Sequence, residues 1–132
     1  MYYIILVNLF KEFFMKCLNK VLLIGFVGNN PIEKSNNNIL YTNFSVATST
    51  QYKQDGETKE KTEWHRIVAF GKLAEICIKY LQKGSKVFIE GSLQKQEYEK
   101  DGIKQSLTYV KLNNLIMLDS AEKNNEIEEI PF

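Results

Sequence analysis

The sequence predicts an all-β protein built as a small five-stranded barrel with one helix, long hairpins and a flexible acidic C-terminal tail. Short apolar runs, rich in Val, Ile, Thr, Tyr and Phe, alternate after Asn19 with turns that contain Asn, Asp and Gly. One segment, between the third and fourth runs, has helical periodicity instead. Strands of this length around a single helix suit a Greek-key barrel of the OB type, a binding platform that leaves its ligand open.

Three strands are predicted before the helix, and turn residues separate them. These strands span Val21–Val27, residues 40–50 and residues 62–70, with turns or loops at residues 28–31, 35–38 and 54–57.

The helix is predicted from one apolar stripe that ends at Gly84. Its members recur at i, i+3, i+4, i+7 and i+8, and they are Leu73, Ile76, Cys77, Tyr80 and Leu81. Two strands follow, over residues 86–93 and 107–118, with a hairpin turn at Asp101-Gly102 between them.

Composition favours a binding protein without a cofactor. A chain of 132 residues with 44% hydrophobic and 25% charged residues is ordinary for one globular domain. Two cysteines and one histidine cannot form a familiar zinc site, and Cys77 lies on the apolar stripe, which favours a core thiol in a reducing compartment. No phosphate loop or nucleophile motif is present, so we expect no enzyme activity.

The two ends of the chain differ from the body between them. Residues 119–132 contain five carboxylates and one lysine, a net −4, so residues 1–118 carry +5 of the overall +1. The last residues place an apolar anchor behind two acids: Glu128, Glu129, Ile130, Pro131 and Phe132. A solubilising tail needs no such tip, which favours a partner-binding hook.

Residues 1–15 are apolar but too short to span a bilayer and lack the features of a signal peptide. We interpret them as a start placed upstream of Met15, and the alternatives are an added strand or short helix, or a targeting segment. The expected division is therefore 1–15 as an extension, 16–118 as an OB-fold domain and 119–132 as the acidic tail.

The most informative strand is residues 62–70. Side chains alternate along a strand, so one face carries Trp64, Arg66, Val68 and Phe70 while the other carries His65, Ile67 and Ala69. Two aromatic rings with an arginine between them can stack bases and hold the connecting phosphate. The alternative is that Trp64 and Phe70 fill the barrel core.

Further aromatic residues lie where hairpins should project. Tyr52 and Tyr98 each precede an Asp-Gly turn, and six lysines surround them: Lys53, Lys59, Lys61, Lys95, Lys100 and Lys104. Aromatic and basic residues interleaved in this way are typical of a groove for a single nucleic-acid strand.

Several blocks resemble bacterial single-stranded DNA-binding proteins in order and spacing. They are residues 19–21 (Asn-Lys-Val), 62–66 (Thr-Glu-Trp-His-Arg), 70–75 (Phe-Gly-Lys-Leu-Ala-Glu), 80–85 (Tyr-Leu-Gln-Lys-Gly-Ser), 87–93 (Val-Phe-Ile-Glu-Gly-Ser-Leu) and the Ile-Pro-Phe end. The resemblance covers about residues 18–118 and the tip. The family's long linker, rich in Gly, Gln and Pro, is here reduced to about a dozen residues.

The resemblance implies specific roles. Base stacking falls to Tyr52, Trp64, Phe70 and Tyr98, contacts with the DNA backbone to Arg66 and Lys72, and a subunit contact to His65. From the interleaved pattern on the hairpins, we expect Lys53 and Lys95 to contact the DNA backbone as well. The resemblance also implies a cytoplasmic, nucleoid-associated homotetramer that protects single-stranded DNA and recruits replication, recombination and repair proteins through its tip, without membrane contact.

Three rival interpretations remain open at this point. One is a primosome-type accessory OB protein, and another is a secreted OB module that binds oligosaccharide. The third is a structural adaptor whose aromatic residues are buried in the core.

Overall fold

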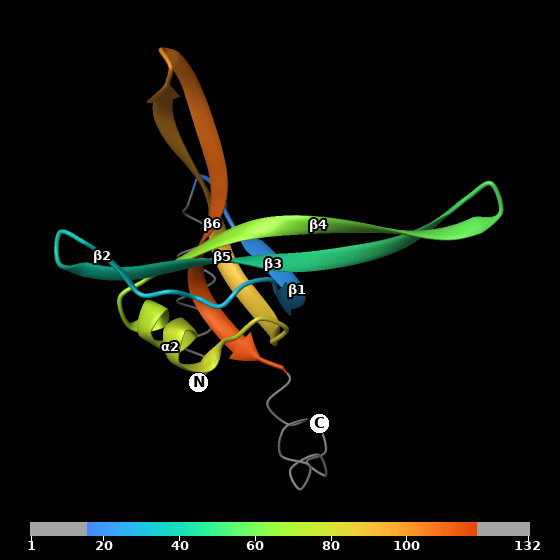
Figure 1. Ribbon diagram of the computed structural model, residues 1–132, viewed down its shortest axis with the longest axis horizontal. Coiled ribbons are helices and arrows are strands. Elements are labelled where there is room, and N and C mark those ends of the chain that lie inside the picture. The colour runs from blue at the N-terminus through green and yellow to red at the C-terminus, as the bar shows by residue number, and fades with distance from the viewer. Residues whose placement is uncertain (1–15, 119–132) are drawn as a thin grey trace, which may run out of the picture.

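Six strands and one helix make up the part of the chain that the computed structural model describes, residues 16–118 (Figure 1). In chain order they are β1 (Val21–Val27), β2 (Lys34–Asn36), β3 (Ile39–Gln54), β4 (Glu57–Phe70), α2 (Lys72–Tyr80), β5 (Lys86–Lys100) and β6 (Ile103–Met117). The strand order in the sheet is β1-β5-β6-β4-β3-β2, and β1 also pairs with β3. That extra pairing closes the five long strands into a barrel, which confirms the predicted OB fold.

Closure depends on two close approaches of backbone to backbone. Strand β1 pairs with β5 along most of its length and with β3 only at Phe26 and Val27. A Cβ atom added at Gly25 would collide with the carbonyl oxygen of Ala47 on β3. A Cβ atom at Gly91, beside the register shift in β5, would collide with the carbonyl oxygen of Lys111 on β6. Glycine at these two sites lets the strands bend and approach, as barrel corners require.

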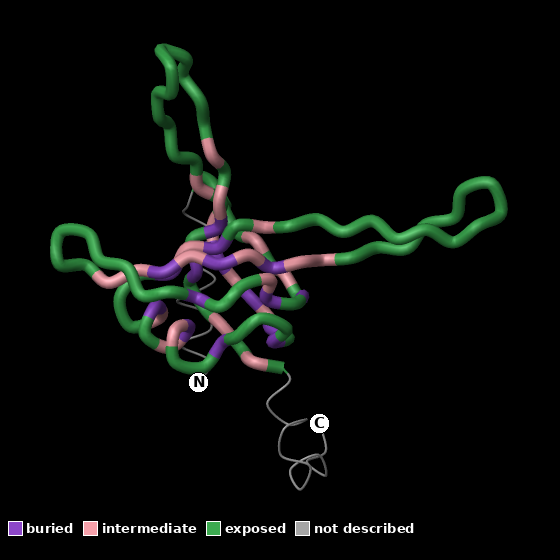
Figure 2. Tube along the Cα trace, viewed as in Figure 1, coloured by how far each residue is buried: buried purple, intermediate pink, exposed green. Residues whose placement is uncertain are grey.

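The core fills the barrel and the contact with α2. Figure 2 shows buried residues gathered at this centre, while the outer parts of the hairpins are exposed. Alternate residues of the strands supply the core, as period-2 patterning predicts. The buried apolar residues are Val27, Phe44, Val46, Ile67, Ala69, Ala74, Cys77, Leu81, Val87, Ile89, Val110 and Leu112.

The barrel carries two long hairpin arms, one formed by β3 and β4 and the other by β5 and β6 (Figure 1). Their ladders continue to Gln54–Glu57 and Lys100–Ile103, well beyond the strand ends predicted at residues 50, 62 and 93. Polar sequence hid these extensions, because backbone hydrogen bonds hold the arms without an apolar face. Both arms turn at an Asp-Gly pair with positive φ at each residue, as predicted for tight hairpins.

Two local predictions were wrong. The predicted asparagine loop contains β2, which pairs with β3, and the turn itself is made by Asn37 and Asn38 at φ 50° and 65°. The helix ends at Tyr80 rather than near Gly84, since Leu81 is already extended with ψ 145°. Tyr80 is exposed, and Ala74 replaces it on the buried face of α2.

Cys77 is fully buried on the inner face of α2, as its place on the apolar stripe predicted. Burial removes water from the thiolate and raises the pKa of the Cys77 thiol to about 12. Cys17 is exposed, and both thiols are free. Within residues 16–118, no helix is both long and apolar enough to cross a membrane.

Candidate nucleic-acid interface

The outer face of β4 carries the predicted row of aromatic and basic side chains. Trp64 is 63% exposed and Phe70 is 39% exposed, whereas Ile67 and Ala69 of the opposite face are completely buried. The strand alternation is therefore confirmed, and the rival that buries both aromatic residues in the core is wrong. Phe70 lies six positions after Trp64 along the strand, a distance of about 20 Å at ~3.3 Å per residue.

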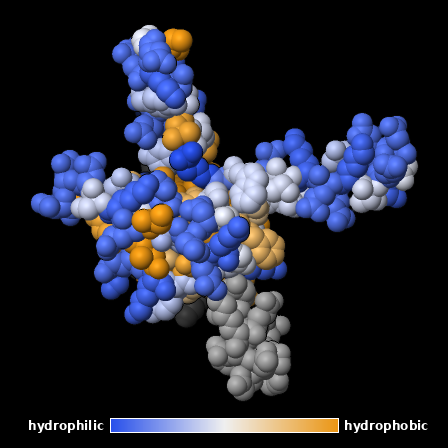
Figure 3. Space-filling model, viewed as in Figure 1, coloured by the Kyte–Doolittle hydropathy of each residue, from blue (hydrophilic) through white to orange (hydrophobic). Residues whose placement is uncertain are grey.

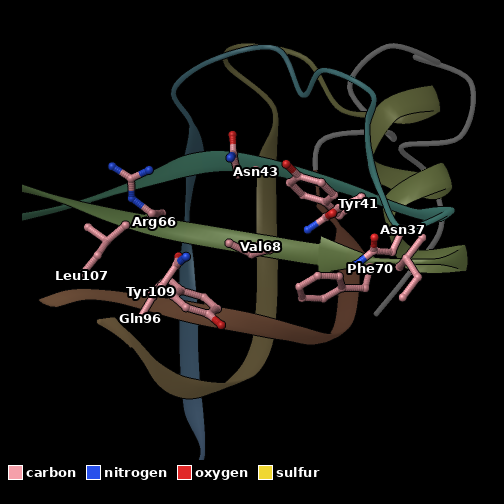
Figure 4. A pocket seen from close by; sticks show the side chains of 11 residues that line it. Asn37, Tyr41, Asn43, Arg66, Val68, Phe70, Gln96, Leu107 and Tyr109 are labelled. Atoms are coloured by element: carbon pink, nitrogen blue, oxygen red, sulfur yellow. The ribbon is translucent and has the colours of Figure 1, made fainter. Parts of the chain in front are cut away.

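Two adjoining hollows join Trp64 to Phe70. One, which we call the ring hollow, has a volume of about 370 Å³ and contains the side chains of Tyr41, Phe70 and Tyr109 (Figure 4). The other, the tryptophan hollow, has a volume of about 400 Å³ and is lined by Trp64. Both share three lining residues, Asn43, Arg66 and Leu107, so they form one groove across β3, β4 and β6.

Trp64 is held in place by the loop that follows β1. A Cβ atom at Gly28 would collide with the indole ring and with the hydroxyl of Ser45. The loop is fixed to β3 because the Gly28 amide donates to the Ser45 carbonyl oxygen at 2.8 Å. In return, the amide and hydroxyl of Ser45 both donate to Asn29 Oδ1, at 2.9 and 3.0 Å. The indole thus lies against a fixed surface on one side and is open to solvent on the other.

Positive charge lies along the groove. The guanidinium of Arg66 makes no hydrogen bond or ion pair with any side chain of residues 16–118, so it is available to an anionic ligand. Lys111 Nζ lies 5.8 Å from the centroid of the Phe70 ring, a cation–π distance. Lys72 is exposed at the first position of α2, two residues beyond Phe70.

The arms carry the other predicted stacking residues away from this groove. Strand alternation puts Tyr98 on the same side of its hairpin as Gln96, which lines the ring hollow. The Tyr98 hydroxyl donates to Gln105 Oε1 at 2.8 Å. Tyr52 lies on the side of the β3–β4 hairpin that carries His65, not on the side that carries Trp64. Of the lysines, Lys53 shares the Trp64 side and Lys95 lies on the side opposite Tyr98.

His65 is half-buried on the opposite side of β4 from Trp64, as predicted. Its Nε2 atom is 2.8 Å from the hydroxyl of Thr48 on β3. That hydrogen bond occupies one ring nitrogen and leaves Nδ1 for another partner.

Most lining residues of the ring hollow were not predicted from the sequence, among them Tyr41, Asn43, Gln96 and Tyr109. A signal for them exists in the alternation of strand residues. Tyr41 and Asn43 flank the buried Thr42, and Tyr109 precedes the buried Val110. Reading β3 and β6 as closely as residues 62–70 would have placed these side chains on the outer face.

The predicted partner-binding residues, Glu128 to Phe132, and the extension 1–15 lie outside the described residues. Among residues 16–118 there is no group of three or more His, Cys, Asp or Glu side chains that could hold a metal ion.

Fold and groove together define an OB-fold binding protein with an open aromatic and basic face. Over residues 18–118 the chain matches the model of the single-strand binding protein family. The chain therefore belongs to that family.

Relatives and solved structures agree with this assignment. The chain is 44% identical over 119 residues to single-stranded DNA-binding protein 1 of Chlorobaculum tepidum, covering 87% of this chain and 74% of that one. It is 43% identical over 104 residues to the single-stranded DNA-binding protein of Xanthomonas axonopodis, covering 76% and 58%. A structure of the Plasmodium falciparum SSB in complex with ssDNA superposes with a TM-score of 0.72 at 35% identity, covering 80% of this chain and 98% of that one.

Replacing Gly28 by alanine should displace the indole of Trp64, because the new Cβ atom and the ring cannot occupy the same space. We expect a changed emission maximum for this sole tryptophan and a free energy of unfolding lower by about 1–3 kcal/mol. Both are measured in one urea titration followed by fluorescence.

Gly56→Ala is the matched control. Gly56 lies at a hairpin tip with φ 78° and open space around it, so alanine there should cost about 1–2 kcal/mol through backbone strain alone. Its native emission should stay as in the parent. Native emission and stability that are both unchanged in Gly28→Ala would show that the indole does not rest on Gly28.

Proposed function

We propose that this protein binds and protects single-stranded DNA, with little dependence on base sequence, during replication, recombination and repair. The observation that carries the proposal is the exposed groove from Trp64 to Phe70, with Arg66, whose guanidinium has no partner within residues 16–118, between the two rings. Membership of the single-strand binding protein family supports a binding role rather than catalysis. A cytoplasmic, nucleoid-associated location follows from the same proposal.

Each part of the groove supplies a different term in the binding free energy. Bases stack on the open faces of Trp64 and Phe70, which contributes about 1–3 kcal/mol per base and is tolerant of sequence because every base has a π-face. Arg66 and the lysines neutralise phosphates and release counterions, so affinity falls as salt rises. Tyr98 and Lys95, on one arm, and Tyr52 and Lys53, on the other, extend this path beyond the barrel.

Titration with oligothymidylate should quench the emission of Trp64 to saturation, and more weakly as salt is raised. Phe70→Ala should lose about 1–3 kcal/mol of binding free energy. Arg66→Gln should make the negative slope of log K against log salt shallower by about 0.7, the value for one phosphate contact on a single strand.

Tyr80→Ala removes an exposed aromatic ring that lines neither hollow and should bind as the parent does. If Trp64 emission did not respond to DNA at any salt concentration, Trp64 would not lie on the binding face and the proposal would be wrong.

We also propose that the protein self-associates, as a homotetramer, through the outer face of β1, β5 and β6. Ile24, 57% exposed, lies opposite Phe88, which in turn lies opposite Ile116. Leu22 and Phe26 flank Ile24 on the same face and are also exposed. An apolar row across three strands is a feature of protein interfaces.

The edge of β1 supports a second copy as the occupant of this face. Because β1 pairs with β3 only at Phe26 and Val27, its first five residues have one edge that no strand of residues 16–118 covers. An open edge next to an apolar face suits pairing with the same strand of another copy, and a self-complementary patch gives closed symmetry. His65 is proposed as a further subunit contact through its free ring nitrogen.

Ile24→Lys should reduce the mass measured by sedimentation equilibrium, because it buries a charge in the proposed interface. Ile103→Lys is the matched control, since Ile103 is 62% exposed but lies at a hairpin tip. It should keep the parent mass. A parent protein that is monomeric at micromolar concentration, or an Ile24→Lys protein of parent mass, would contradict the interface.

The C-terminal tip is proposed to recruit other DNA-processing proteins. Its carboxylates, Glu128 and Glu129, suit a basic rim, while Ile130, Pro131 and Phe132 suit an apolar pocket that also receives a C-terminal carboxylate.

Deletion of residues 128–132 should leave the affinity for oligothymidylate intact and abolish capture of replication and repair proteins on DNA-bound protein, identified by mass spectrometry. Ile103→Ala, which changes an exposed apolar residue elsewhere, should capture the parent set. The same set bound by the deleted and the parent protein would show that the tip is not the recruiting element.

A further inference from the structure

The ring hollow combines three aromatic rings from three different strands. Tyr41 on β3 lies opposite Phe70 on β4, with ring centroids 6.2 Å apart and ring planes inclined by 33°. Figure 4 shows Tyr109 of β6 on the far side of Val68 from Tyr41. Val68 provides an apolar floor between the Phe70 and Tyr109 rings. This site is larger and more aromatic than a single stacking platform needs.

Two amide side chains give the hollow a polar component. Asn43 is half-buried and lies opposite Val68, and its side-chain amide makes no hydrogen bond to any group of residues 16–118. Gln96 of β5 also lines the hollow, and its side-chain amide likewise makes no hydrogen bond to any group of residues 16–118. An amide offers one donor and one acceptor side by side, so it can read the edge of a base rather than only its face.

We propose that the ring hollow is an adenine-reading subsite in which a base stacks on Phe70 and Tyr109 and pairs with the amide of Asn43. The inference rests on the proposed binding of single-stranded DNA and adds to it a modest base preference at one position of the path. Tyr41 acts as a positioning residue that fixes the Phe70 ring.

The shape and polarity of the hollow select adenine. Three rings around about 370 Å³ favour the larger π-face of a purine. On the Hoogsteen edge of the base, an Asn or Gln amide matches the N6 donor and N7 acceptor of adenine, whereas guanine presents two acceptors there. An unpaired base also offers its Watson–Crick edge, so the hollow selects adenine when the base stacks with its N7 side toward Asn43. Arginine suits that guanine edge, but Figure 4 shows Arg66 directed away from the three rings.

The test compares three oligonucleotides on the parent protein. The first is thymidylate throughout, and the second has adenine at every third position so that any binding register can fill the hollow. The third has 7-deazaadenine at the same positions, which stacks but lacks the N7 acceptor. We expect adenine to bind roughly fivefold more tightly than 7-deazaadenine, at the lower limit for one bidentate contact.

Variants locate the effect. Asn43→Ala should bind thymidylate nearly as the parent does and should no longer distinguish adenine from 7-deazaadenine. Asn113→Ala, which changes an exposed asparagine that lines neither hollow, should keep the full difference.

Equal affinity of the parent protein for adenine and 7-deazaadenine would overturn the subsite while leaving DNA binding in place, and this result needs no variant to fold. Tighter binding of a guanine-substituted oligonucleotide, or a difference that persists in Asn43→Ala, would also overturn it. Failure to bind thymidylate at all would overturn the proposed function and the subsite together.

Discussion

The near contact of β1 with β3, made possible by the missing side chain of Gly25, is the constraint on which the rest of the structure depends. It turns a sheet into a barrel, so that the inner residues of every long strand share one core. Gly91 likewise leaves room for a close backbone approach, where β5 bends against β6. Once the barrel is closed, the residues between those of the core must face outward. The groove and the apolar face of β1 are thus consequences of the same alternation.

The outer surface divides into regions with different physical characters. Figure 3 shows hydrophilic residues over most of both hairpin arms. The arms are held mainly by ladder hydrogen bonds and bury little, so they open at a lower free energy than the core strands. The groove residues, by contrast, stand on β3, β4 and β6 where these strands line the core. The aromatic rings on the barrel that we propose to stack bases are therefore rigid, whereas those proposed on the arms can adapt to the path of a flexible strand.

Binding that tolerates every sequence and a site that reads one base are compatible. Stacking and phosphate neutralisation act at each nucleotide and give most of the affinity. An amide beside three rings acts at a single position and changes that affinity only by the value of its hydrogen bonds. Tyr41 and Asn43 lie on β3 and Tyr109 lies on β6, far away in sequence, and only the pairing of β3, β4 and β6 brings them together.

The sequence by itself determined the five strands of the barrel and the helix, though not their ends, together with the barrel type and the outward face of residues 62–70. These follow from local periodicity and turn chemistry, in which each residue reports on its near neighbours. Tertiary structure decided what local pattern does not encode. The polar arms extend past the apolar alternation because backbone ladders need no hydrophobic face, and β2 forms because β3 offers it an edge. The ring hollow exists because β4 and β6 pair in parallel, with Val68 beside Lys111. This register places Tyr109 of β6 next to β4. Contacts between residues about forty positions apart depend on the register in which two strands pair. No local segment of the sequence specifies that register.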